Sequence, residues 1–125
     1  GAKRAIMLPM SIPSHCSLMQ AAAEMMQRQL THLTLQAPKI PILHNVDVKT
    51  HSDAASIKQI LIQQLISPVR WVDTIQAFSV AGVTNIVECG PGKVLAGLNK
   101  RINSNLQQLS LADSEAIRQA VNSLS

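Results

Sequence analysis

The sequence predicts an α/β fold in which helices alternate with the strands of a largely parallel sheet. Short apolar segments typical of strands alternate along the chain with segments whose apolar residues recur at helical spacing. Proline and glycine residues separate these segments, as they do at turns. The 125 residues, of which 46% are apolar, suffice for one domain with its own core, and neither a repeat nor a linker divides them.

The N-terminal half is predicted to hold two strands and two helices. An apolar run predicts a strand over residues 4–8, and a loop stiffened by prolines follows. Helical spacing of apolar residues predicts a helix over 16–33. Residues 40–47 predict a second strand, after which Asp53 can cap a helix that stops at Pro68.

The C-terminal half continues the alternation. Gly82 ends one helix, a strand then leads into a glycine-rich turn, and a capping side chain starts the closing helix. The expected elements are a helix over 69–81, a strand and turn over 84–92, a helix over 93–102, a strand over 106–111 and a helix capped by Asp113 or Ser114.

The charge of the chain suits an acidic partner without identifying it. The 11 Lys and Arg residues outnumber the 7 Asp and Glu residues, which gives a formal net charge of +4. These cations are scattered, only Trp71 and Phe78 could stack on bases, and no zinc finger or RNA-binding motif occurs. We therefore expect no binding to nucleic acid.

The absence of membrane-spanning, signal-peptide, disulfide and metal-binding patterns predicts where the protein is located. No run of about 18 apolar residues exists to cross a bilayer, and Pro9 and Pro13 interrupt the segment that a signal peptide would need. Cys16 and Cys89 are far apart, and no pair of histidines has the spacing of a metal motif. These patterns predict a cytoplasmic protein without membrane association or a metal site.

The glycine-rich turn over residues 90–93 (GPGK) lies between a strand and a helix, where a phosphate-binding loop would lie. A Walker A loop would need glycine and a hydroxyl residue where this chain has Val87 and Val94. We interpret the segment as a tight turn that starts the helix, with Pro91 fixing φ.

His15 is the candidate catalytic residue. It lies in a loop stiffened by Pro9 and Pro13, directly before a helix, and rigid scaffolds present reactive side chains from such positions. An ordinary loop or capping role stays open, because a lone histidine often has one. To act as a base, His15 needs an acceptor for its Nδ1–H and a nucleophile at Nε2.

The main-chain carbonyl of Gln64 is a candidate acceptor. In a helix this oxygen would accept from the N–H of residue 68, which is proline and has none. A buried or half-buried carbonyl needs some donor, which an imidazole, water or a neighbouring hydroxyl could be. A nucleophile is not evident, because no GxSxG elbow occurs and Ser14 is the immediate neighbour of His15.

Four segments together form a specific signature, although each alone is weak: PSHCSLM, HNVDV, SPVRW and CGPGKVL. In their order and spacing they resemble the C-terminal portion of bacterial malonyl-CoA:acyl carrier protein transacylases, and the match covers essentially the whole chain. The resemblance implies the last strand of a ferredoxin-like small subdomain within residues 1–10. Over residues 11–125 it implies the C-terminal part of an α/β-hydrolase-like acyltransferase large subdomain.

This resemblance also implies a reaction. Such enzymes move malonyl from malonyl-CoA to the phosphopantetheine thiol of acyl carrier protein in type II fatty acid synthesis, through an acylated serine and without a further cofactor. His15 would be the general base, and the carbonyl of Gln64 would orient it. The family's serine precedes Gly1, so the 125-residue chain alone is expected to be inactive. Lys3 and Arg4 would lie near the carrier-protein groove.

Two other functions stay open at this point. The chain could be a non-catalytic basic α/β module that binds an acidic protein, or part of the acyltransferase domain of a polyketide synthase. Without the rest of the subdomain, residues such as Ile6, Ile42 and Ile86 would lose their packing partners. We therefore expect the isolated piece to self-associate, or to stay bound to the missing N-terminal portion of the same protein.

Overall fold

In the computed structural model the chain forms two compact units, Gly1–Val69 and Arg70–Ser125. The structure describes all residues except Ala2, Leu8 and Ser125. The division follows Pro68, where the helix of the first unit has ended and the next has not begun. A proline at this place ends the helix because it lacks the N–H that would continue it.

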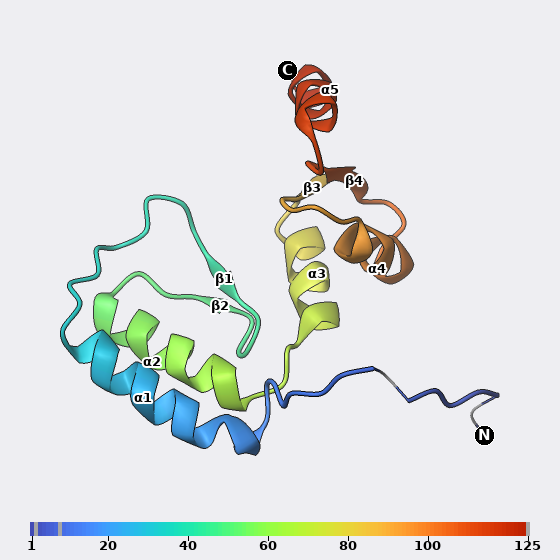
Figure 1. The fold of residues 1–125 in the computed structure, drawn as a ribbon. Helices are drawn as coiled ribbons and strands as arrows, with labels where there is room; N and C mark the ends of the chain where they lie inside the picture. The colour runs from blue at the N-terminus through green and yellow to red at the C-terminus, as the bar shows by residue number, and fades with distance from the viewer. Residues whose placement is uncertain (2, 8, 125) are drawn as a thin grey trace. The chain divides into compact units, whose positions relative to one another are not determined.

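Two helices side by side form the centre of the first unit (Figure 1). A short 3₁₀ turn, η1 (Ser17–Met19), leads into α1 (Gln20–Thr31), which packs on α2 (Ala54–Ile66). The apolar residues buried in these helices are Ala23, Leu30 and Ile60. As predicted, α2 begins at Asp53, whose carboxylate accepts from the backbone N–H of Ser56 at 2.8 Å.

A small antiparallel hairpin lies between these helices in the chain. It consists of β1 (Leu43–His44) and β2 (Lys49–Thr50), with Leu43 opposite Thr50. The predicted strand over 40–47 is therefore mostly wrong, because the chain reverses after His44 and pairs with itself. The reversal depends on Val48, whose φ of 59° is in the left-handed region that a β-branched residue seldom enters.

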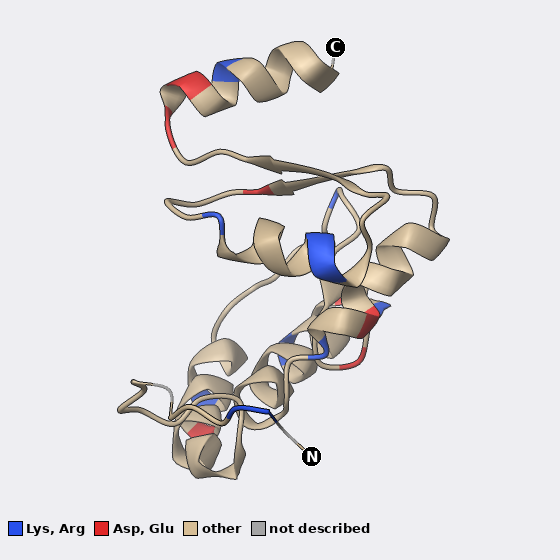
Figure 2. Ribbon diagram, turned by 90° about the vertical axis from the view of Figure 1, so that its right-hand side faces the viewer, with Lys and Arg blue, Asp and Glu red and all other residues tan. Residues whose placement is uncertain are grey.

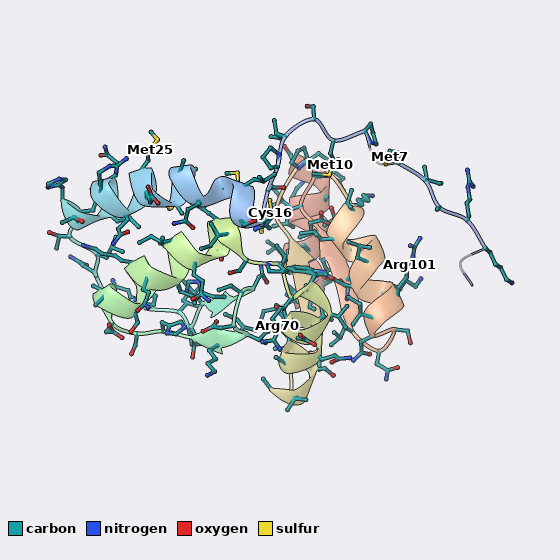
Figure 3. The ribbon with its side chains drawn as sticks, turned by 90° about the horizontal axis from the view of Figure 1, so that it is seen from below. Met7, Met10, Cys16, Met25, Arg70 and Arg101 are labelled. Carbon is teal, nitrogen blue, oxygen red and sulfur yellow. The ribbon has the colours of Figure 1, made fainter. Side chains whose placement is uncertain are left out.

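The N-terminal segment carries no strand in its described residues, so the predicted strand over 4–8 is absent from 4–7 (Leu8 lies outside the described residues). A strand satisfies its backbone groups by pairing with a neighbour, and no neighbouring strand is described here. Met7 and Met10, which project from this segment in Figure 3, are 94% and 64% exposed.

The second unit confirms the predicted alternation of helix and strand. The elements are α3 (Trp71–Val80), β3 (Asn85–Glu88), α4 (Val94–Ile102), β4 (Gln107–Ser110) and α5 (Ser114–Leu124). Strands β3 and β4 pair in parallel, with Asn85 opposite Gln107, and α4 connects them. Asp113 caps α5 by accepting from the N–H of Ala116 at 2.8 Å.

A buried polar network ties the second unit together around α4. The indole Nε1 of Trp71 donates to Oδ1 of Asn99 at 2.9 Å. The amide of Asn99 in turn donates to Oε1 of Gln108 at 3.1 Å. Asn99 is 1% exposed and Ile75, which is fully buried in α3, lies in the same small core. The network therefore links α3, α4 and β4 while leaving both polar groups of the Asn99 side chain bonded.

In the described part of the chain, no helix is long and apolar enough to cross a membrane.

Candidate functional site

His15 is held by unusual backbone geometry at the end of the proline-stiffened segment. Its φ is +53°, in the left-handed region, which costs energy for any residue except glycine. The 3₁₀ turn η1 starts two residues later, with Cys16 as its N-cap, and the backbone N–H of Met19 donates to the carbonyl of Cys16 at 3.0 Å. The side chain of His15 is therefore presented from a local turn that the following helix fixes.

The structure brings His15 and Gln64 together. Nδ1 of His15 lies 2.9 Å from the main-chain oxygen of Gln64, in the last turn of α2. Because Pro68 cannot donate to this oxygen, the helix itself leaves it open to a side-chain donor. The two residues are 49 positions apart in the chain, and the packing of α1 and η1 on α2 accounts for their meeting.

This hydrogen bond fixes the tautomer of the imidazole. A carbonyl oxygen only accepts, so Nδ1 of His15 must carry the proton. In the neutral ring, Nε2 then bears the lone pair and can accept a proton from another group. His15 is exposed, so a hydroxyl or thiol can approach that nitrogen. The arrangement supplies a base and its orienting acceptor, two of the three parts that activation of a nucleophile requires.

Lys3 and Arg4, the predicted partner-binding residues, are exposed in the N-terminal segment. No described contact joins them to His15 or Gln64. Their exposed charges can attract an acidic surface, but the structure does not bring them into the site that His15 forms.

A side chain of the protein itself, which the sequence did not predict, binds the backbone N–H groups at the start of α4, after the glycine-rich turn. The carboxylate of Glu88 accepts from the N–H of Leu95 at 3.2 Å and from the N–H of Ala96 at 2.8 Å. These are the donors that a bound phosphate would use at a helix N-terminus. A carboxylate already bonded to them repels a second anion, which agrees with the interpretation of the segment as a structural turn. The spacing of seven and eight residues from Glu88 gave no recognised capping signal.

A cluster of ionisable side chains in the hairpin was also missed. His51 is half-buried, and its Nε2 lies 2.8 Å from Oδ2 of Asp47. The ring of His51 lies 5.5 Å, centre to centre, from that of His44. The only sequence signal was that Asp47 and His51 are four residues apart. Their side chains come into contact because the chain reverses at Val48.

The hairpin environment shifts two pKa values. Burial lowers the pKa of His44 below its ordinary value, and the neighbouring His51 lowers it further. For Asp47, partial burial raises the pKa, but hydrogen bonds from the His51 ring and the Lys49 N–H outweigh it and leave the pKa lowered. Among the described residues, no group of three His, Cys, Asp or Glu side chains could hold a metal ion.

Solved structures share this fold over almost the whole chain. The malonyl CoA-acyl carrier protein transacylase of Coxiella burnetii is 44% identical, with a TM-score of 0.92 over 98% of this chain and 39% of that one. A malonyl-transacylase solved in complex with a type II PKS acyl-carrier protein is 40% identical, with a TM-score of 0.94 over 98% of this chain and 40% of that one. The fold therefore defines the chain as part of an α/β acyltransferase.

Curated sequences narrow the class to one family. The malonyl CoA-acyl carrier protein transacylase of Salmonella typhimurium is 45% identical over 121 residues, which are 97% of this chain and 39% of that protein. No protein-family model matches the chain. The chain thus spans about two fifths of the length of its relatives and corresponds to the C-terminal portion of the malonyl CoA-acyl carrier protein transacylases.

Proposed function

We propose that the complete protein transfers a malonyl group from coenzyme A to the phosphopantetheine thiol of acyl carrier protein, with His15 as general base. The observation that carries this proposal is the hydrogen bond of 2.9 Å between Nδ1 of His15 and the carbonyl of Gln64. The relatives described above are named for this activity, and the chain matches them over 97% of its own length.

The proposed chemistry uses the lone pair on Nε2 of His15. In the first half-reaction Nε2 takes the proton of a serine hydroxyl, encoded before Gly1, as the serine oxygen attacks the malonyl thioester. The proton then passes to the sulfur of coenzyme A, which leaves. In the second half-reaction Nε2 takes the proton of the carrier thiol, whose sulfur attacks the malonyl ester, and returns it to the serine oxygen. The carbonyl of Gln64 stabilises the imidazolium that forms in each step.

Exposed cations contribute to carrier binding in this proposal. Lys3 and Arg4 provide positive charge outside the site, which would speed the encounter with an acidic carrier protein. The likeness to a transacylase that was solved with a type II PKS acyl-carrier protein favours a second candidate, in which the carrier belongs to a polyketide synthase. Transfer rates to the two kinds of carrier protein distinguish these candidates.

Malonyl transfer by the complete protein tests the proposal directly. We expect malonyl-carrier product from malonyl-CoA and holo carrier protein, and none from the 125-residue chain alone, because none of its serines lies in a GxSxG elbow. Robust turnover by this chain alone would show that the nucleophile is misplaced. A complete protein that binds carrier protein without accepting malonyl would support a non-catalytic module instead.

Association of the isolated chain is a separate expectation. Large apolar side chains are exposed in both units, among them Ile12 at 74%, Ile40 at 76% and Val94 at 70%. Surfaces of this kind drive association when nothing covers them. We expect the isolated chain to form dimers or larger species in light scattering, and a well-dispersed monomer would contradict this.

A further inference from the structure

The hairpin formed by β1 and β2 has few backbone contacts to hold it closed. Each strand has two residues, and the pairs that join them are Leu43 with Thr50 and His44 with Lys49. The turn between the strands (Figure 1) includes Val48, whose φ of 59° is unfavourable for a β-branched residue. A two-stranded hairpin is only marginally stable by itself. The closed form of this hairpin therefore depends on contacts between its side chains.

Asp47 supplies the contacts that close the turn. Its Oδ1 accepts from the backbone N–H of Lys49 at 3.1 Å, and its Oδ2 lies 2.8 Å from Nε2 of His51. A carboxylate only accepts, so Nε2 of His51 carries the proton of this bond. Partial burial raises the pKa of Asp47, but the hydrogen bonds from His51 and Lys49 outweigh it and lower the pKa. Asp47 is therefore charged throughout the pH range in which histidines titrate.

His44 is the group that the closed hairpin does not accommodate in its charged form. It is 7% exposed, and its ring lies 5.5 Å, centre to centre, from the ring of His51. Burial lowers the pKa of His44 and the neighbouring His51 lowers it further, which together outweigh the opposite effect of Asp47. One carboxylate balances one imidazolium, so a proton on each ring leaves an uncompensated charge in a buried place.

The other charged groups near the hairpin add positive charge. Lys49 is opposite His44 in the strand register, and Lys39 lines a pocket of 230 Å³ together with His51. Acidic positions are sparse along the ribbon (Figure 2), and Asp47 is the only acidic residue of the hairpin. The helices α1 and α2 carry three charged side chains, none of which has a described electrostatic interaction with His44: Glu24, Arg28 and Lys58. A proton on His44 therefore has no counter-charge besides Asp47 among these groups.

We propose that His44, Asp47 and His51 form an acid-sensitive clasp, which opens the hairpin locally when His44 takes up a proton. In the closed form His51 donates to Asp47 and His44 is neutral. In the open form the ring of His44 reaches water, which stabilises its charge. The rest of the first unit stays folded, because the packing of α1 on α2 does not involve these three side chains.

The sign of the pH dependence follows from the pKa of His44. In the open hairpin the ring is in water, where its pKa is the ordinary value of about 6.5. In the closed hairpin the pKa is lower. The open form therefore binds the proton more readily, so the closed form is favoured at neutral pH and loses stability as the pH falls from about 6.5 toward the lowered pKa.

The clasp fixes the chain directly before α2. His51 is followed after one residue by Asp53, whose carboxylate caps this helix. The last turn of the same helix holds the carbonyl of Gln64, which accepts from His15. Acid would thus release the segment that leads into the helix of the candidate site. The clasp itself does not depend on the proposed malonyl transfer, since it requires only residues of the hairpin.

Hydrogen exchange in the complete protein, followed by mass spectrometry of peptides that cover residues 43–51, tests the clasp. After correction for the intrinsic exchange rate at each pH, we expect protection of these peptides to fall by about tenfold between pH 7 and pH 5. Peptides from α4 should keep their protection. His32→Asn is the matched control, because His32 is an exposed histidine at the end of α1 and its replacement should leave the response of the hairpin unchanged.

Two variants should keep the hairpin protected at pH 5 for different reasons. His44→Asn removes the group that takes up the proton. Lys49→Glu keeps His44 and the backbone N–H that Asp47 accepts, and it adds a counter-charge opposite the ring. The proposal is overturned if protection over 43–51 does not change with pH, or if Lys49→Glu loses as much protection as the unaltered protein. An equal loss in α4 would also overturn it, because the whole protein would then be unfolding in acid.

Discussion

His15 in the first unit and Asn99 in the second both form hydrogen bonds between residues distant in the chain, and the settings of the two bonds differ. Asn99 is buried, adopts ordinary helical backbone and has both polar groups of its side chain bonded. His15 is exposed, has a φ of +53° and has one ring nitrogen bonded. A buried, fully bonded network stabilises a fold, whereas an exposed bond on a strained backbone adds little stability. This difference agrees with a structural role for the Asn99 network and with the catalytic role that we propose for His15.

The largest effect is expected from removal of the imidazole. His15→Ala in the complete protein should lower the rate of malonyl transfer by roughly 10² to 10⁴, the usual contribution of a general base. The free energy of unfolding should change little, because the side chain of His15 and its hydrogen bond to Gln64 are both exposed. Steady-state kinetics and urea unfolding measure the two quantities. A large loss of stability with unaltered turnover would reverse the roles assigned to His15 and Asn99.

The opposite pattern is expected at Asn99. Asn99→Ala removes the partner of both Trp71 and Gln108 inside the core, which should lower the free energy of unfolding by about 2–3 kcal/mol. Urea denaturation measures the change, and Asn105→Ala, at an exposed position in the same unit, is the control that should unfold like the unaltered protein. Equal stability of the two variants would show that the Trp71–Asn99–Gln108 network contributes nothing.

A smaller, pH-dependent effect is expected at His44. Burial and the neighbouring His51 lower the pKa of His44 below 6.5 in the folded state, so the unfolded state binds a proton more readily. Stability should therefore fall as the pH is lowered from 6.5 toward the folded pKa. His44→Asn should flatten this part of the stability–pH profile, measured by urea unfolding at several pH values. The same slope in both proteins would contradict the assignment.

The smallest effect is expected at Gln64, although its oxygen is the partner of His15. Gln64→Ala keeps the main-chain carbonyl and the helix, so malonyl transfer should remain within a fewfold of the unaltered rate. Steady-state kinetics beside His15→Ala provide the comparison. A loss as large as that of His15→Ala would assign a role to the side chain of Gln64.

Elements with local signals were predictable from the sequence. Asp53 and Pro68 mark the two ends of α2, and the missing N–H of Pro68 singled out the carbonyl that His15 approaches in the structure. The β3–α4–β4 unit followed from alternating patterns and its turn. In these cases the information lies within a few residues of the feature that it determines, so a single sequence contains enough of it.

The features that were not predictable depend on contacts between distant residues or on rare backbone geometry. The hairpin after His44 requires a left-handed Val48, which β-branched residues disfavour, so its sequence suggested a continuing strand. A strand over 4–8 depends on a neighbour that local pattern cannot supply. Glu88 reaches the start of α4 across the glycine-rich turn, outside the spacing of known capping motifs.

The oxygen that accepts from His15 belongs to the polypeptide backbone, and this affects how the site tolerates genetic change. A codon change at position 64 alters a side chain but cannot delete a carbonyl. Loss of the acceptor requires instead that residue 68 regain an amide hydrogen to compete for it. Selection for an oriented histidine would therefore act on Pro68, while position 64 could drift among residues that keep the last turn of α2 intact.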